Sequence, residues 1–442
     1  MHIRHVTIEN VRRFRTGEAG FDLSLPPRGW IVVAGRNGAG KTTFLKVIAL
    51  ALSNSFAHEY TDTMFSWIRP GAGIARSRLT LVPADDDELQ RGVNILSTKA
   101  SDEELIVGDE WAPTYGAMRH GREGDGNRAF AGPWHGDPKG WFAAGYGANR
   151  RLLGQANAAD NWATATSREG AFLTLFRDDA SLTHPIRWLM DLDYRSLDRN
   201  VSEAERDDSR HIVEGVIALL NDELLDDIEV KGVDSRGLSV VQDGQPLSIF
   251  NLGAGAQILV ALVVDVLRHM HARFGKLRFA RKGARAVVGH SGVVLIDEAE
   301  AHLHPAWQRR IGFWLKEHFP NIQFIVTTHS PFICQAADSD GLIRLPSPGE
   351  AGAPEHITGD AFQTVVNGGA DDAVLSHLFG LEQSHSRESE RMRERVAALE
   401  VKEIRSKLTA HEKKELRELR GKLPRSGSAL VEQTLRKLKA EL

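Results

Sequence analysis

The chain has 442 residues, a length that suits one large α/β domain with additions or two to three domains. Its net charge of −4 excludes an overall basic field, and its 42% hydrophobic residues can fill a sizeable core. The single cysteine, Cys334, excludes intramolecular disulfides and fits a cytoplasmic protein in which it packs as a small buried hydrophobe. The first residues lack an apolar signal core, and no apolar run approaches the roughly 18 residues that span a bilayer. We therefore expect no membrane segment.

Three stretches near the N-terminus predict strands. Residues 2–9 and 21–25 alternate apolar and polar side chains, which indicates an antiparallel pair. The apolar run 30–34 predicts a buried strand. Between the first two strands lie Arg12, Arg13 and Arg15. They either reach a nucleotide or a phosphate backbone, or they are solvated charges at a strand edge, and the second interpretation is favoured.

A phosphate-binding loop follows the third strand. Residues 35–43 fit the pattern G-x-x-x-x-G-K-[ST], and the apolar residues after them have helical spacing, so the motif has its strand–loop–helix context. Glycines let backbone N–H groups turn toward phosphate oxygens, and the helix N-terminus adds partial positive charge. Lys41 is predicted to reach the β- and γ-phosphates of ATP, and Thr42 to offer its hydroxyl to Mg²⁺. The predicted ATP-binding residues of this loop are Gly35, Arg36, Asn37, Gly38, Ala39, Gly40, Lys41, Thr42 and Thr43.

The middle of the chain is less regular. Between 54 and 145 we expect a meander of short strands with long loops, in which the acidic run 85–88 is solvated. Tyr146 and Arg150 follow a strand end, and they are either close to a nucleotide or a packed aromatic with a surface arginine. An inserted lobe with helices and a hairpin is predicted over 161–245.

Two carboxylates at the end of a buried strand are the second strong signal. The apolar run 292–296 leads into Asp297, predicted to hold Mg²⁺, and Glu298, predicted to orient or deprotonate the attacking water. Adjacent buried carboxylates are costly without a nearby positive charge, which the phosphate-binding loop supplies. A further buried strand, 322–328, places His329 at a sheet edge where ligands bind, and there it could hydrogen-bond a γ-phosphate.

Several weaker signals surround these motifs. A glycine-rich turn with Gly253 and Gly255 precedes a long apolar helix, an arrangement that can bind anions. His302 and His304 have the alternate spacing of metal ligands, but no third ligand is apparent, so a turn that contacts a second subunit is favoured. Asp265 and His269 lie four residues apart on a helix, and we interpret them as a surface or packed pair.

Together these motifs resemble the ABC-type ATPases of the group that includes the SMC, RecF and OLD families, described more broadly as bacterial AAA-family ATPases. The resemblance covers residues 1–55 and 245–345 and is carried by three segments: Ile8–Phe14, Leu295–Gln308 and Phe319–Pro331. Within the group the chain is most similar to the ATPase subunits of Septu-type and retron-associated anti-phage defence systems. The expected fold class is therefore an α/β P-loop NTPase head with a mixed β-sheet, an inserted helical lobe and a C-terminal helical tail.

The resemblance also implies a function. It implies a homodimer or higher homo-oligomer that sandwiches ATP and Mg²⁺ between two heads and controls a separate effector nuclease. In such a dimer Gly253 and Gly255 form the signature turn that faces the other subunit's phosphate-binding loop, and the catalytic residues are Lys41, Glu298 and the switch histidine His329. The alternative is a RecF- or SMC-like DNA-repair ATPase that binds DNA directly.

Two departures from the family pattern matter. The signature usually reads L-S-x-G, but Gly253 stands at the serine position, which predicts slow turnover. No strand-borne acidic cluster of a nuclease domain follows residue 345. The remaining tail, with a capping box at Thr409–Glu412 and a local basic surplus, is either a solvated hairpin or a docking surface for a partner protein or nucleic acid. The expected domains are 1–160, 161–245, 246–345 and 346–442.

Overall fold

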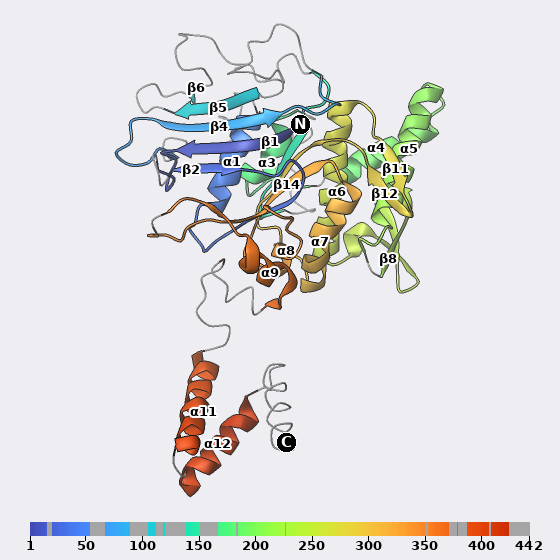
Figure 1. Ribbon diagram of the computed structural model, residues 1–442. Coiled ribbons are helices and arrows are strands. Elements are labelled where there is room, and N and C mark those ends of the chain that lie inside the picture. Colours follow the sequence, from blue (N-terminus) through green and yellow to red (C-terminus); the bar gives the residue numbers. More distant parts are fainter. Residues whose placement is uncertain are drawn as a thin grey trace. The chain divides into compact units, whose positions relative to one another are not determined.

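The computed structural model forms two compact units, Met1–Gly380 and Leu381–Leu442 (Figure 1). It describes residues 1–15, 20–53, 67–88, 105–111, 118–119, 138–150, 167–182, 184–225, 227–350, 352–370, 378, 387–405 and 408–423. The glycine-rich segment 121–126 and the apolar segment around 371–381, apart from residue 378, lie outside the described residues.

A six-stranded mixed sheet is the centre of the first unit. Its strands, in spatial order, are β16 (Glu355–His356), β15 (Leu342–Arg344), β3 (Gly29–Ala34), β14 (Ile322–Thr328), β13 (Gly292–Ile296) and β7 (Ala143–Tyr146). All neighbours are parallel except β16, which is antiparallel to β15. Parallel strands present their carboxyl ends at one edge, so the residues that follow β3, β14, β13 and β7 meet there.

A second, antiparallel sheet carries the N-terminal strands. Its order is β2 (Phe21–Ser24), β1 (His2–Glu9), β4 (Ala75–Val82), β5 (Leu105–Trp111) and β6 (Met118–Arg119). The predicted antiparallel pair and the predicted meander are both confirmed. Helix α1 (Lys41–Ser53) contacts β4 and β5 of this sheet as well as β7, β13 and β14 of the other, so it lies between them and is buried almost throughout.

One buried amide joins the two sheets. The ladder between β1 and β4 shifts register between Ile3 and His5. Gln323 of β14, which is fully buried, accepts a hydrogen bond from the Ile3 N–H at 2.8 Å and donates to the Ile3 carbonyl at 2.8 Å and the Pro26 carbonyl at 2.5 Å. The side chain thus satisfies both backbone groups of Ile3 that the irregular ladder exposes.

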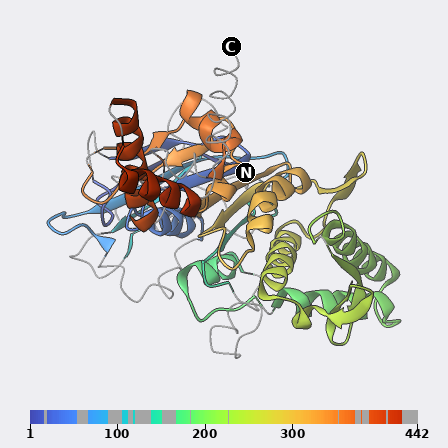
Figure 2. The ribbon, with the colours of Figure 1, turned by 90° about the horizontal axis from the view of Figure 1, so that it is seen from below.

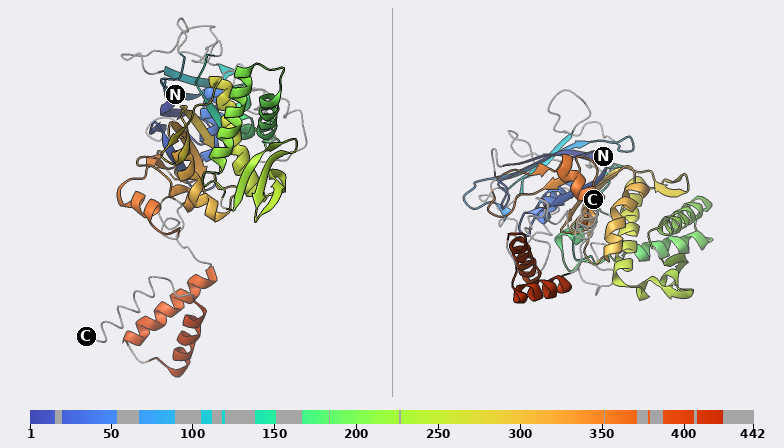
Figure 3. Two further views of the ribbon diagram at one scale, coloured as in Figure 1. Left: turned by 90° about the vertical axis from the view of Figure 1, so that its right-hand side faces the viewer. Right: turned by 60° about the horizontal axis from the view of Figure 1, so that its bottom comes forward.

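The predicted lobe combines helices with a small sheet. Helices α4 (His184–Leu197) and α5 (Glu203–Leu220) pack on each other and on the three-stranded sheet β10–β9–β8 (Figure 3). Its strands are β8 (Ile228–Asp234), β9 (Gly237–Gln242) and β10 (Gln245–Ser248). A capping box at Ser202 and Glu205 starts α5, and the predicted apolar stripe on that helix is buried. A 3₁₀ turn (Gly170–Phe172) and α3 (Leu173–Phe176) precede the lobe, and a second 3₁₀ turn (Ile249–Asn251) follows it.

Three more helices and a hairpin complete the unit. They are α6 (Ala254–Phe274), α7 (Pro305–His318), α8 (Pro331–Cys334) and the hairpin of β11 (Phe279–Lys282) and β12 (Arg285–Val288). Helix α6 is long and apolar enough to cross a membrane by length and composition, contrary to our expectation of no such run, but 78% of its apolar window is buried inside the protein. Such burial is typical of a core helix.

The first unit also extends beyond the domain boundary expected at residue 345. Strand β16 pairs with β15, and α9 (Gly359–Asn367) contacts α8. The physical reason is that an edge strand gains a backbone hydrogen-bonding partner here, which the short spacing of β15 and β16 allows. Cys334 of α8 is completely buried, as expected, and burial raises the pKa of its thiol.

The second unit is a helical hairpin of α11 (Arg387–Arg405) and α12 (Ala410–Lys422). Its small core consists of Leu399, Leu408 and Leu416, and ion pairs such as Arg395–Glu415 cross between the helices. The predicted capping box at Thr409 and Glu412 is confirmed. Two other expectations are wrong. Ile404 of the expected apolar stripe is 85% exposed, and α12 continues through Gly421 rather than stopping there.

We predict that Gln323→Leu destabilises the first unit. Leucine fills a similar volume but leaves the Ile3 N–H and carbonyl buried without a partner, which costs roughly 2–4 kcal/mol of unfolding free energy. Urea unfolding followed by tryptophan fluorescence measures this cost. The matched control is Gln245→Leu, because Gln245 is exposed. Equal stability of the two variants would contradict a role for Gln323 in joining the sheets.

Candidate active site

The predicted phosphate-binding loop connects β3 to α1. Gly35, Gly38 and Gly40 have φ angles of 155°, 77° and 94°, in the region that favours glycine. A Cβ atom on Gly40 would lie 2.8 Å from the Phe14 ring, so a larger residue does not fit there. Arg36, Asn37 and Gly38 are exposed, and Ala39 is buried. The backbone therefore adopts a tight glycine-dependent turn at the N-terminus of a buried helix.

Lys41 lies inside this turn. Its Nζ donates to the Gly35 carbonyl at 2.8 Å and the Arg36 carbonyl at 3.3 Å, and it lies 2.8 Å from Nε2 of His329. Burial lowers the pKa of Lys41 to about 8. Burial and the charge of Lys41 also lower the pKa of His329, which keeps its imidazole neutral and able to accept the lysine proton. The structure thus brings together two of the three predicted catalytic side chains.

Thr42 and Asp297 form the second half of the site. The Thr42 hydroxyl donates to Asp297 Oδ2 at 2.8 Å, and the Thr327 hydroxyl donates to Asp297 Oδ1 at 2.5 Å. Asp297 is only 4% exposed, so both of its oxygens are held by designed partners from α1 and β14. A hydroxyl and a carboxylate side by side are hard oxygen donors, the set that Mg²⁺ prefers, and these residues fit that ion.

Glu298 has an uncommon backbone conformation. Its φ angle is 45°, in the left-handed region, and its N–H donates to the Thr327 hydroxyl at 2.8 Å. The guanidinium of Arg150 donates to the carbonyls of Asp297 at 2.7 Å, Glu298 at 3.0 Å and Gly147 at 2.9 Å. A residue that is not glycine adopts this conformation only when its surroundings impose it. Here Thr327 and Arg150 hold the two sides of the peptide.

Arg150 therefore has a role that neither sequence interpretation described. It is 1% exposed, so it is not a surface arginine, and its three acceptors belong to the protein backbone. Burial lowers its pKa to about 10, which leaves it charged near neutral pH. Tyr146 is packed, and its hydroxyl donates to Asp265 at 3.1 Å. Asp265 and His269 are a packed pair, as interpreted, and burial lowers the pKa of His269 to about 3.

A residue that the sequence did not single out fixes the histidine. Glu300 accepts a hydrogen bond from the Thr328 hydroxyl and another from the His329 N–H, both at 2.6 Å. The carboxylate thus sets the backbone position of His329 at the end of β14. The charge pattern Asp297–Glu298–Glu300 was the available signal, because a third carboxylate near a strand end also needs a partner.

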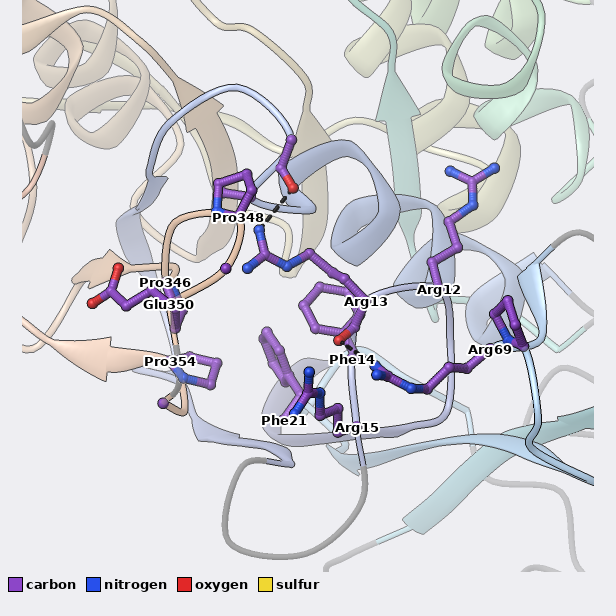
Figure 4. Close-up of a pocket in the computed structure, with 15 residues that line it drawn as sticks. Arg12, Arg13, Phe14, Arg15, Phe21, Arg69, Pro346, Pro348, Glu350 and Pro354 are labelled. Carbon is purple, nitrogen blue, oxygen red and sulfur yellow. Dashed lines mark hydrogen bonds between the residues drawn. The ribbon is translucent and has the colours of Figure 1, made fainter.

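An open pocket of about 580 Å³ adjoins the loop (Figure 4). Arg13 donates to the Gly38 carbonyl at 2.7 Å and the Ser347 carbonyl at 2.9 Å, and Arg12 donates to the Thr43 hydroxyl at 3.1 Å. These two arginines contact the loop, which differs from the favoured interpretation of solvated edge charges. The pocket is lined by Arg12, Arg13, Phe14, Arg15, Phe21, Gly38, Ala39, Arg69, Pro70, Pro346, Pro348, Gly349, Glu350, Gly352 and Pro354.

The two signature glycines have different surroundings. Gly253 is exposed at the start of α6, with a φ angle of −60°, and a Cβ atom there would meet nothing within 4 Å. Gly255 packs closely, since its Cβ would lie 2.7 Å from the Trp307 ring and 2.9 Å from the His302 carbonyl. Gly255 therefore has a packing role, while Gly253 is free to contact another molecule. His304 caps α7, because its Nδ1 accepts from the Ala306 N–H at 3.3 Å.

Comparisons with known proteins agree with this site. A family model described as "AAA domain, putative AbiEii toxin, Type IV TA system" matches residues 151–335, and a second "AAA domain" model matches residues 5–97. A "Retron Vc95 probable ATPase" of Vibrio cholerae serotype O1 biovar El Tor is 37% identical over 26% of this chain and 21% of its own length. The "Septu protein PtuA" of Bacillus mycoides (strain KBAB4) is 25% identical over 74% of this chain and 38% of its own length.

Among solved structures, an SMC head bound to the C-terminal winged-helix domain of ScpA is similar with a TM-score of 0.49 and 15% identity. The match covers 81% of this chain and 98% of that chain. This chain spans between 21% and 38% of the length of the two curated relatives described above. From the matched family models and relatives, this chain carries AAA-family ATPase domains and is homologous to the retron probable ATPases and to the Septu protein PtuA.

Proposed function

We propose that this chain binds and hydrolyses ATP with Mg²⁺. The observation that carries the proposal is the hydrogen bond between Thr42 at the start of α1 and Asp297 at the end of β13, directly beside the buried Lys41. Three elements that are far apart in sequence place a hydroxyl, a carboxylate and an ammonium group at one sheet edge. This combination serves phosphoryl transfer, which depends on positioning and on charge stabilisation.

Each side chain has a task in this proposal. Lys41 binds the β- and γ-phosphates, and the glycine turn supplies backbone N–H groups to them. Mg²⁺, held by Thr42 and Asp297, neutralises charge on the phosphates. Glu298 orients the attacking water and accepts its proton, and His329 contacts the γ-phosphate from β14. The pocket beside the loop has room for the base and ribose of the nucleotide, and Arg12 and Arg13 border it.

We further propose that two copies close head to head around ATP and control a separate effector nuclease in a bacterial anti-phage defence complex in the cytoplasm. Homology to the retron probable ATPases and to Septu PtuA supports this assignment. The exposed Gly253 supports the dimer, because a helix N-terminus with no side-chain cap has backbone N–H groups that can reach the phosphates of a facing subunit.

The first prediction concerns Glu298→Gln. Removing the general base should lower the hydrolysis rate about 10²-fold or more while ATP binding persists. The variant should then accumulate as an ATP-bound dimer, measured by size-exclusion chromatography with light scattering. Co-expressed with its genomic neighbours, the tagged chain should purify with a nuclease in fixed stoichiometry.

The matched control is Glu214→Gln, an exposed carboxamide substitution on α5 that should change neither rate nor assembly. Unchanged hydrolysis in Glu298→Gln would remove Glu298 from the catalytic role. A lone dimer that captures DNA only with ATP would instead favour the DNA-repair alternative.

The second prediction concerns Gly253→Ser. The backbone conformation and the open space at this position accept a serine, which can also cap α6. A new hydrogen bond to a facing γ-phosphate is worth roughly 1.5–3 kcal/mol, so hydrolysis should rise tenfold or more. Steady-state phosphate release measures the rate. No rise in hydrolysis or in ATP-dependent assembly would argue against the signature role, and Gly253→Ala controls for the added side chain.

The third prediction concerns Arg150, a positioning residue that acts through the backbone of Asp297 and Glu298. Arg150→Gln should reduce kcat at least tenfold and leave the affinity for a non-hydrolysable ATP analogue nearly unchanged, because Lys41 and the loop remain intact. Arg150→Lys should recover only part of the rate, since one ammonium cannot reach three carbonyls in the planar guanidinium geometry. A parallel loss of ATP affinity and kcat would indicate general unfolding instead.

A further inference from the structure

The β11–β12 hairpin carries a concentration of positive charge in an otherwise acidic protein. From Val266 to Ile296 the sequence contains seven lysines and arginines and no aspartate or glutamate. Five of these cations lie on or next to the hairpin: Lys276, Arg278, Arg281, Lys282 and Arg285. All five are exposed. The local field is therefore strongly positive although the net charge of the chain is −4.

The hairpin is held firmly at its base. The Phe279 ring lies against α5 where Gly215 leaves room, since a Cβ atom at Gly215 would be 2.5 Å from that ring. Arg278 forms an ion pair with Asp86 at 2.6 Å. Figure 2 shows the yellow hairpin extending from the body beside α5. The base is thus fixed and the strand ends with their tight turn remain accessible.

The tip contains an arrangement that folding alone does not favour. Lys282 and Arg285 are directly opposite each other in the ladder, so their like charges share one face of the ribbon. Cross-strand pairs of like charge are destabilising. Arg285 is relieved by an ion pair with Glu317, while Arg281 and Lys282 have no acidic partner among the residues that the structure describes. A sequence that keeps such a pair at an exposed tip gains from it only when an anion binds there.

We infer that the β11–β12 hairpin is a docking surface for the phosphate backbone of double-stranded DNA. A two-stranded ribbon fits the major groove of B-form DNA, whereas the major groove of A-form RNA is too deep and narrow. The exposed ion pairs of Arg278 and Arg285 are worth little in water, so both arginines can exchange a carboxylate for a phosphate. This inference does not depend on ATP hydrolysis, and failure of either proposal leaves the other testable.

The test is duplex DNA binding by the full chain, with and without ATP, measured by fluorescence anisotropy over a range of salt concentrations. Arg281→Ala/Lys282→Ala should weaken binding at least tenfold, and the slope of log Kd against log salt should fall by roughly two. The charge-reversed Arg281→Glu/Lys282→Glu should abolish binding. Both variants should hydrolyse ATP as the wild type does, which shows that they fold.

The matched control is Arg187→Glu/Arg199→Glu, which makes the same change of net charge at two exposed arginines on and after α4. It should bind DNA as the wild type does. Three outcomes would overturn the inference: no DNA binding by the wild type with or without ATP, equal losses in the hairpin and control variants, or tighter binding to duplex RNA or polyglutamate than to duplex DNA.

Discussion

The buried carboxylate of Asp297 is the constraint on which the first unit depends. A carboxylate that is 4% exposed must be paired, and here one oxygen accepts from α1 and the other from β14 while the residue itself ends β13. The order β3–β14–β13 in the sheet follows from the same requirement, since only this arrangement brings Thr42, Thr327 and Asp297 to one edge. The polar cluster and the parallel sheet are thus two descriptions of one arrangement.

Around Asp297 the backbone, more than the side chains, is held in place. Thr327 receives the Glu298 N–H, Arg150 donates to the carbonyls on either side of that peptide bond, and Glu300 receives the His329 N–H. The two residues proposed to act on water and on the γ-phosphate therefore leave the ends of their strands in fixed directions. Preorganisation of this kind is what a site needs if it is to stabilise developing charge without rearranging first.

The sequence was informative where the chemistry is local. The phosphate-binding loop, the strand before it and the helix after it are adjacent in sequence, so spacing alone predicted them, and the acidic strand end followed in the same way. Arg150 and Gln323 could not be predicted from spacing, because their acceptors lie 147 and 320 residues away. Tyr146 and Arg150 were recognised as notable, yet only the adjacency of β7 to β13 explains why the arginine faces inward. Gly255 was expected to bind nucleotide, but close packing on Trp307 gives it a different reason to be glycine.

The hydrogen bonds between Gln323 and Ile3 also define a common pivot. From this point β14 runs to His329, which touches Lys41, and β1 runs toward Arg12, which touches Thr43. The two strands are two arms that start from one fixed joint and end on neighbouring residues of the phosphate-binding loop. A displacement of either arm at the nucleotide is therefore a rotation about that joint, and the two sheets turn together as one lever instead of sliding past each other.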